Sequence, residues 1–156
     1  WLAHRNGKGI IILINKWDLI EKKEIFSKIL EEKIKEKISP FTDVPIFFVS
    51  VKNKQRLIKS LELATKVHKS RLNRIPSRKL NDVILPIIEK TPPPSFKGKL
   101  IKIKFCKQLK TKSPKFSFFS NFPKYIKEPY GRFLENKLRE NFDFSGVPIQ
   151  IIFKEK

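Results

Sequence analysis

The stretch that decides the fold is GIIILINKWDL, residues 9–19. Its first six residues form an apolar run without polar alternation, which is typical of a strand buried on both faces of a parallel sheet. Asn15, Lys16 and Asp18 follow directly, at the carboxyl end of this strand. Because ligands of open α/β sheets bind at that end, the stretch predicts both a parallel sheet and a ligand site at its edge.

The residues after this stretch alternate between helical and strand patterns. Residues 21–38 carry isoleucines at helical spacing among charged residues, and Ser39–Pro40 ends that predicted helix. Residues 44–50 repeat the buried-strand pattern, and a second helix is predicted from a face that comprises Leu57, Leu61, Ala64 and Val67. Strand, helix, strand and helix within about seventy residues indicate an α/β unit with parallel strands.

The pattern changes after Arg71. Residues 73–77 predict a linker, and Ser77 is placed to cap the helix that follows. Three prolines at 92–94 end that helix, and alternation over 101–105 predicts a strand with Ile101, Ile103 and Phe105 buried and lysines exposed. A second strand around Phe116, Phe118 and Phe122, a helix from Pro129 and a strand over 147–153 complete an α-β-β-α-β order. We therefore expect domains over 1–72 and 78–156, joined by 73–77.

Asn15, Lys16 and Asp18 form an N-K-x-D pattern whose chemistry suits a guanine base. One carboxylate accepts hydrogen bonds from the N1–H and N2–H groups of guanine, a donor pair that adenine lacks. The asparagine amide can serve N7 and tie neighbouring loops, while the lysine stem can lie over the base. The alternative is an ordinary turn at a strand end, in which Asn and Asp are common.

Five stretches resemble, in the same order along the chain, the Der (EngA) family of bacterial tandem GTPases that act in ribosome assembly. They are NKWDL (15–19), RIPSRKLN (74–81), PPPSFKGKLIKIKF (92–105), FFSNFP (118–123) and YGRFLENKLRENFDFSGVPI (130–149). The resemblance implies that residues 1–72 are the C-terminal portion of a P-loop GTPase domain and that 78–156 are a KH-like domain. It also implies a full protein that binds GTP and GDP, hydrolyses GTP and acts in large-subunit maturation.

The resemblance also assigns a second base-binding loop, formed by Ser50, Val51 and Lys52, whose backbone N–H groups face guanine O6. Val51 stands where the family usually has a smaller alanine, which would crowd the base. The chain has no G-x-x-x-x-G-K-[ST] loop and no D-x-x-G motif, so the phosphate and Mg²⁺ ligands are expected upstream. The chain begins with Trp1 and has no Met, as expected of the C-terminal piece of a longer protein. We expect this piece alone to be inactive.

The formal charge of +20 points toward a polyanionic partner. Ten lysines and no acidic residue fall within positions 97–127, and the predicted RNA-contacting side chains are Lys97, Lys99, Lys102, Lys104 and Lys115. The alternative is a lysine-rich composition, since 28 lysines accompany 7 arginines in the whole chain. The second half also lacks the G-x-x-G loop of typical KH domains, which weakens the case for RNA binding in a KH groove.

These patterns predict precursor large ribosomal subunits and rRNA as partners of a monomeric protein. Its location would be the cytoplasm of a bacterium or endosymbiont, or an organelle of bacterial descent. A different class of function, a non-enzymatic basic RNA-binding module with the GTPase remnant as scaffold, stays open. The sequence has no window of about eighteen uncharged apolar residues, so it predicts no membrane-spanning helix. One cysteine, Cys106, excludes a disulfide framework and a cysteine-based zinc site, and it is expected to be a small buried hydrophobe.

Overall fold

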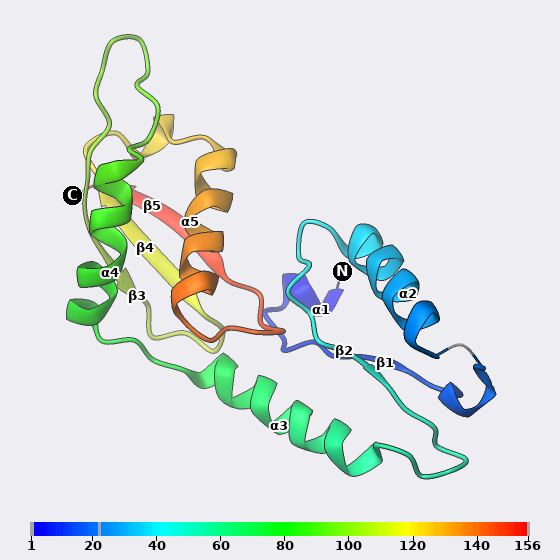
Figure 1. The fold of residues 1–156 in the computed structure, drawn as a ribbon. Helices are drawn as coiled ribbons and strands as arrows, with labels where there is room; N and C mark the ends of the chain where they lie inside the picture. The colour runs from blue at the N-terminus through cyan, green and yellow to red at the C-terminus, as the bar shows by residue number, and fades with distance from the viewer. Residues whose placement is uncertain (1, 22, 156) are drawn as a thin grey trace. The chain divides into compact units, whose positions relative to one another are not determined.

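The computed structural model describes residues 2–21 and 23–155, which form two compact units (Figure 1). The first unit comprises Trp1–Arg71 with Ser145–Pro148, and the second comprises Leu72–Phe144 with Ile149–Lys156. Trp1, Lys22 and Lys156, which the predicted domains include, lie outside the described residues. None of the helices in the described part of the chain is long and apolar enough to cross a membrane.

The first unit has the predicted alternation of strands and helices. Its elements are α1 (Leu2–Arg5), β1 (Ile12–Ile14), the 3₁₀ turn η1 (Trp17–Leu19), α2 (Lys23–Ile38), β2 (Ile46–Phe48) and α3 (Leu57–Leu72). β1 and β2 pair in parallel, with Ile12 opposite Ile46 and Ile14 opposite Phe48. The parallel pairing predicted from the two apolar runs is therefore confirmed, although each strand is only three residues long.

Burial in this unit is lower than the apolar runs predict. Leu13 of β1 is 49% exposed, so the prediction of a strand buried on both faces is wrong for the described residues. Of the four apolar positions expected to share one buried face of α3, Leu61 and Ala64 are exposed and Val67 is buried. The physical reason is that two strands are hydrogen-bonded in this sheet, and α2 contributes no buried residue to cover them.

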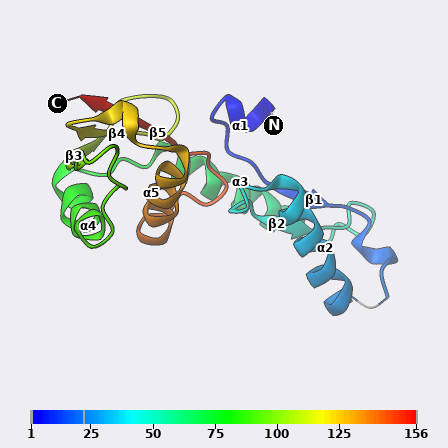
Figure 2. The same cartoon turned by 90° about the horizontal axis from the view of Figure 1, so that it is seen from above.

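The second unit has the predicted α-β-β-α-β order. Its elements are α4 (Ser77–Lys90), β3 (Ile103–Gln108), β4 (Lys115–Ser120), the 3₁₀ turn η2 (Pro123–Tyr125), α5 (Glu128–Asn141) and β5 (Gln150–Glu155). The sheet order is β3-β4-β5, with β3 antiparallel and β5 parallel to β4. Figure 2 shows α4 and α5 on the same side of this sheet. The unit is therefore a two-layer fold whose sheet has one face without a helix.

A dense apolar core fills the space between the two helices and the sheet. It consists of Ile75, Leu80, Ile84, Ile88, Ile103, Cys106, Phe116, Phe118, Tyr130, Leu134, Leu138, Phe142, Phe144 and Ile149. The prediction that Cys106 is buried is confirmed, since the residue has no exposed surface. The buried residues of α4 (Leu80, Ile84 and Ile88) and of β4 thus belong to one shared core, whereas Phe122, which was predicted for the second strand, lies beyond the end of β4.

A register shift in β3 changes which side chains reach this core. The pairing of β3 with β4 is irregular between Ile103 and Phe105, so the strand gains a bulge there. Cys106 takes the core-facing position, and Phe105 lies on the other face, where its ring stacks on Phe119. The prediction of Phe105 as a core residue is wrong, because a bulge reverses the alternation beyond it.

Residues 73–76 connect α3 and α4, and several hydrogen bonds hold them. Arg74 donates to the carbonyls of Leu109 and Thr111, and the Ile75 N–H donates to Gln108 Oε1 at 2.8 Å. Ser77 is the first residue of α4 and Pro76 occupies the cap position, so the predicted serine cap is wrong. The connection predicted as a linker is therefore an ordered part of the second unit.

The segment Ser145–Pro148 belongs to the first unit, whereas the sequence placed it within the second domain. The Gly146 N–H donates to Asp43 O at 2.7 Å, and the Ile10 N–H donates to Gly146 O at 2.8 Å. Gly146 has a φ of +69°, and a Cβ there would lie 2.7 Å from Ile10 O. Only glycine satisfies both conditions, so this position fixes how the segment packs beside β1.

Candidate functional site

The turn after β1 is anchored by Trp17. Its side chain is buried, and its ring centroid lies 4.2 Å from that of Phe48. The backbone N–H of Trp17 donates to Val49 O at 3.0 Å. Lys16 precedes it with φ 63° and ψ 31°, a left-handed conformation that reverses the chain at the strand end. Because Trp17 points inward, the flanking Lys16 and Asp18 point toward the surface at the carboxyl end of the sheet.

Asp18 and Ser50 join the loops that follow the two parallel strands. The buried Ser50 hydroxyl donates to Asp18 Oδ1 at 2.5 Å and accepts from the Asn53 N–H at 3.2 Å. The Ser50 hydrogen bond is the main cause that lowers the pKa of Asp18, and the charges of Lys52 and Lys23 act in the same direction. Asp18 is therefore an oriented, ionised carboxylate at neutral pH.

Asn15 makes a second connection between the same two loops. Its Oδ1 accepts hydrogen bonds from the Lys16 N–H at 2.7 Å and from the Val51 N–H at 3.2 Å. The side-chain oxygen of Asn15 is thus occupied by backbone donors, which leaves its NH₂ group as the polar part that can face a ligand. The Val51 side chain is exposed at 56%, so it stands at the surface of the loop.

The structure brings most of the predicted base-contacting residues together. Asn15, Asp18, Ser50 and Val51 are connected by hydrogen bonds, and Lys52 acts on Asp18 through its charge. The Lys16 side chain is exposed. Sequence reasoning missed Asn53, which holds the Ser50 hydroxyl, and Gln55, whose backbone exchanges hydrogen bonds with Ser50. Neither residue type signals such a role, because both act through backbone groups.

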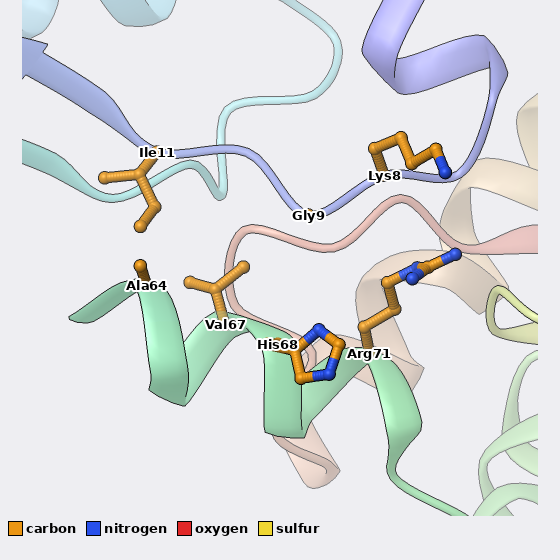
Figure 3. A pocket seen from close by; sticks show the side chains of 7 residues that line it. All are labelled: Lys8, Gly9, Ile11, Ala64, Val67, His68 and Arg71. Carbon is orange, nitrogen blue, oxygen red and sulfur yellow. The ribbon is translucent and has the colours of Figure 1, made fainter. Parts of the chain in front are cut away.

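A separate pocket of about 360 Å³ lies between the segment before β1 and helix α3 (Figure 3). It is lined by Lys8, Gly9, Ile11, Ala64, Val67, His68 and Arg71. Arg71 is engaged, since its Nε donates to Gly7 O at 2.9 Å. None of the predicted base-contacting residues lines this pocket, so it is distinct from the site at the strand ends.

The predicted RNA-contacting lysines divide between the two ends of the second unit's sheet. Lys97 and Gly98 both have positive φ, and Phe96 and Lys99 exchange backbone hydrogen bonds across them, so the turn is a tight hairpin. Lys99 Nζ lies 5.3 Å from the ring centroid of Phe122, and Asn121 bonds the backbone of Lys102. These contacts place the hairpin near the end of the sheet where Ile103 pairs with Ser120.

Lys97, Lys99, Lys102 and Lys104 thus gather at that end, and all four are exposed. Lys115 lies at the opposite end of β4, where it pairs with Gln150. One short stretch of RNA could contact these four lysines together. To contact Lys115 as well, the RNA would have to extend along the length of the sheet.

The described residues contain no group of three or more His, Cys, Asp or Glu side chains that could hold a metal ion. The resemblance likewise assigns none of these residues to Mg²⁺. Burial raises the pKa of the Cys106 thiol to about 12, so this thiol stays protonated at neutral pH and is a poor nucleophile.

Comparison with known proteins gives two findings. Residues 74–154 match the family model described as the KH-domain-like, C-terminal region of EngA bacterial GTPase enzymes. Over 156 residues the chain is 58% identical to the GTPase Der of Christiangramia forsetii and 55% identical to that of Flavobacterium johnsoniae, and it is covered completely in both. The GTPase Der of Porphyromonas gingivalis is 51% identical over 99% of the chain. The chain spans 36% of the length of each of these relatives.

Proposed function

The chain belongs to the EngA (Der) family of bacterial GTPases, and we propose that it contributes the guanine-reading end of a P-loop GTPase domain to a ribosome assembly factor. The observation that carries this proposal is the hydrogen-bonded set Asn15, Asp18, Ser50 and Val51 at the carboxyl ends of two parallel strands. Three relatives that match the whole chain or nearly all of it are named as GTPases, which supports the same assignment.

Base recognition follows from the orientation of Asp18. Ser50 uses one oxygen of this carboxylate, and a carboxylate has lone pairs for further donors on both oxygens. The N1–H and N2–H groups of guanine are two such donors, and a charge-assisted pair is stronger than two neutral hydrogen bonds. Asp18 is ionised at neutral pH and acts as an acceptor only, so a base that presents a carbonyl at this position is repelled.

The phosphate chemistry belongs to other parts of the proposed GTPase. Positioning and charge stabilisation of the transferred phosphoryl group require a phosphate-binding loop and Mg²⁺ ligands. The 156-residue sequence contains no G-x-x-x-x-G-K-[ST] motif that could form such a loop. This chain would therefore hold the base and leave catalysis to the residues that cradle the phosphates. We expect the 156-residue chain alone to hydrolyse no GTP.

The second unit would supply the contact with ribosomal RNA of the large-subunit precursor. Four exposed lysines at one end of its sheet support this role, because each one that reaches a phosphate releases a counterion. Such contacts position a protein on RNA without reading its sequence. We propose a monomer in the bacterial cytoplasm, with GTP or GDP bound at the first unit.

The test exchanges Asp18 for Asn in the longer protein that contains this chain and the phosphate-binding residues. An amide offers one acceptor and one donor, so preference should shift from GDP toward xanthosine diphosphate, whose C2 carbonyl accepts a hydrogen bond. Each charge-assisted hydrogen bond lost is worth about 1.5–3 kcal/mol, which fluorescent-nucleotide titration resolves readily. Asp82→Asn on α4, an exposed position, is the matched control and should change neither affinity. Unchanged guanine and xanthine affinities in Asp18→Asn would refute base reading by Asp18.

A further inference from the structure

The sheet face opposite α4 and α5 carries an unusual set of side chains for an uncovered surface. The strand registers place Phe105, Lys107, Lys115, Ser117, Phe119, Gln150, Ile152 and Lys154 on this face. None of these eight positions is acidic, and three are lysines. A face with fixed positive charge and aromatic rings favours a negatively charged ligand that has flat apolar surfaces.

The two phenylalanines on this face stack on each other, with a lysine close to one of the rings. The rings of Phe105 and Phe119 lie 4.3 Å apart, centroid to centroid, with an interplanar angle of 9°. Lys107 Nζ lies 5.3 Å from the centroid of Phe119. The stacked pair therefore has a cation beside it.

The second side of the Phe105 ring has no aromatic or cationic partner among the described residues. Phe96, in the hairpin, differs in this respect, because Tyr125 stacks on it at 4.3 Å and Lys97 Nζ lies 5.7 Å from its centroid. Phe105 also lies on β3, an edge strand of the sheet, so no further strand lies beyond it in this unit. Phe105 is half-buried and forms the end of the stack that lies toward the sheet edge.

The same edge is unsuited to the addition of a peptide strand. Asn81 accepts from the Cys106 N–H at 2.8 Å and donates to Cys106 O at 2.8 Å. These are the backbone groups that an added strand would need, and α4 supplies a side chain that occupies both. A ligand at this edge must therefore bind through side chains and ring faces rather than through strand pairing.

We propose that the side of the Phe105 ring that faces away from Phe119 stacks a base of single-stranded RNA, with neighbouring phosphates contacting Lys104 and Lys107. The inference rests on the RNA partner of the proposed function and adds to it a base contact that phosphate-binding lysines alone do not supply. Every nucleobase has a flat π face, so such a position holds single strands with little sequence preference. A duplex hides its base faces and would lack this contact.

The experiment titrates the 156-residue chain with two probes of equal length. One is a 12-nucleotide oligouridylate RNA with a single 2-aminopurine, and the other is the corresponding abasic ribose-phosphate chain. We expect 2-aminopurine fluorescence to be quenched on binding, and Phe105→Leu to weaken RNA binding about tenfold without changing affinity for the abasic probe. Phe105→Trp should retain both binding and quenching. Phe133→Leu, a half-buried phenylalanine of α5 that also carries a lysine over its ring, is the matched control.

The outcomes separate this inference from the RNA partner itself. RNA binding without quenching, or equal affinity of the wild type for both probes, overturns base stacking and leaves the phosphate contacts standing. The quenching measurement uses the wild type, so it tests base stacking even if Phe105→Leu fails to fold. No binding of either probe would remove the RNA partner and the stacking position together. An effect of Phe133→Leu as large as that of Phe105→Leu would also overturn the assignment to Phe105.

Discussion

The two units use similar apolar residues with very different burial. In the second unit Leu80, Leu134 and Leu138 have no exposed surface, and fourteen residues share one core. In the first unit Leu13 and Leu61 are 49% and 69% exposed, and α2 buries no residue. The second unit is therefore stabilised by its own core, whereas the apolar surface of the first unit exceeds what its described residues cover.

The difference teaches that the site of the first unit does not depend on a deep core. Its loops are held by two side chain-mediated connections, Ser50 to Asp18 and Val51 to Asn15, and by the inserted ring of Trp17. Hydrogen bonds of this kind fix geometry but contribute only about 1 kcal/mol each to stability. We infer that recognition in the first unit and stability in the second are built from different interactions.

The largest expected effect separates the two units directly. Leu134→Ala in α5 removes a fully buried side chain and should lower the free energy of unfolding of the second unit by about 2–5 kcal/mol. Leu61→Ala in α3 is the same chemical change at an exposed position and should cost at most about 0.5 kcal/mol. Urea denaturation should be followed by tryptophan fluorescence for the first unit and tyrosine absorbance for the second, because the two tryptophans precede Leu72 and both tyrosines follow it.

An equal cost of the two substitutions would contradict the comparison. It would mean that the exposed face of α3 is covered in solution, for example by self-association of the chain. Sedimentation of both variants at two concentrations would identify that case.

The sequence predicted the second unit well because its patterns have local causes. The helix and the strand predicted around these core residues are confirmed as α4 and β4, although Phe122 lies beyond the end of β4. The prediction for Phe105 was wrong because a bulge is set by pairing with β4, which the alternation of β3 alone does not contain. In the first unit, the apolar run of β1 predicted the parallel pairing but not the exposure of Leu13, since burial depends on neighbours outside the run.

The site was predictable to the extent that it depends on side-chain chemistry. The N-K-x-D pattern was identified from residue type and from its position after a strand, whereas Ser50 was assigned through the family resemblance. The direction of the Asn15 oxygen toward the Val51 N–H, and the roles of Asn53 and Gln55, depend on loop conformation and on backbone groups. No residue pattern encodes these, because any side chain supplies the same N–H and C=O.

Alkaline pH should lower the stability of the second unit through Cys106, whereas acid pH should lower that of the first unit through Asp18. Burial raises the pKa of Cys106 from 9.0 to about 12, so the neutral thiol stabilises the fold fully below pH 9 and this contribution is lost as the pH rises toward 12. At pH 11 the loss should be roughly 3 kcal/mol. The measurement is the difference in unfolding free energy between wild type and Cys106→Ala at pH 8 and at pH 11, which should shrink by that amount.

Asp18→Asn in the first unit is the control for this alkaline effect. The pKa of Asp18 is lowered from 3.8, so its contribution is present above that value and is lost only as the pH falls below it. Its difference from the wild type should therefore be the same at pH 8 and pH 11. A Cys106→Ala difference that is likewise constant would show that the thiol ionises in the folded state as easily as in the unfolded chain.

The smallest expected effect tests whether the packing of the second unit is complete. Ser117 has no exposed surface, and its hydroxyl is the buried side-chain polar atom that lacks a hydrogen-bond partner among the described residues. Ser117→Ala removes an unpaired polar group at almost constant shape, so we expect it to stabilise the second unit by about 1 kcal/mol or less.

Ser120, three residues along the same strand, is buried to the same extent, but its hydroxyl donates to Asn121 and accepts from the Phe122 N–H. Ser120→Ala should therefore destabilise the unit by a similar amount, and the two variants should shift the urea midpoint in opposite directions. If Ser117→Ala destabilised the fold as Ser120→Ala does, the Ser117 hydroxyl would have a hydrogen-bond partner in solution.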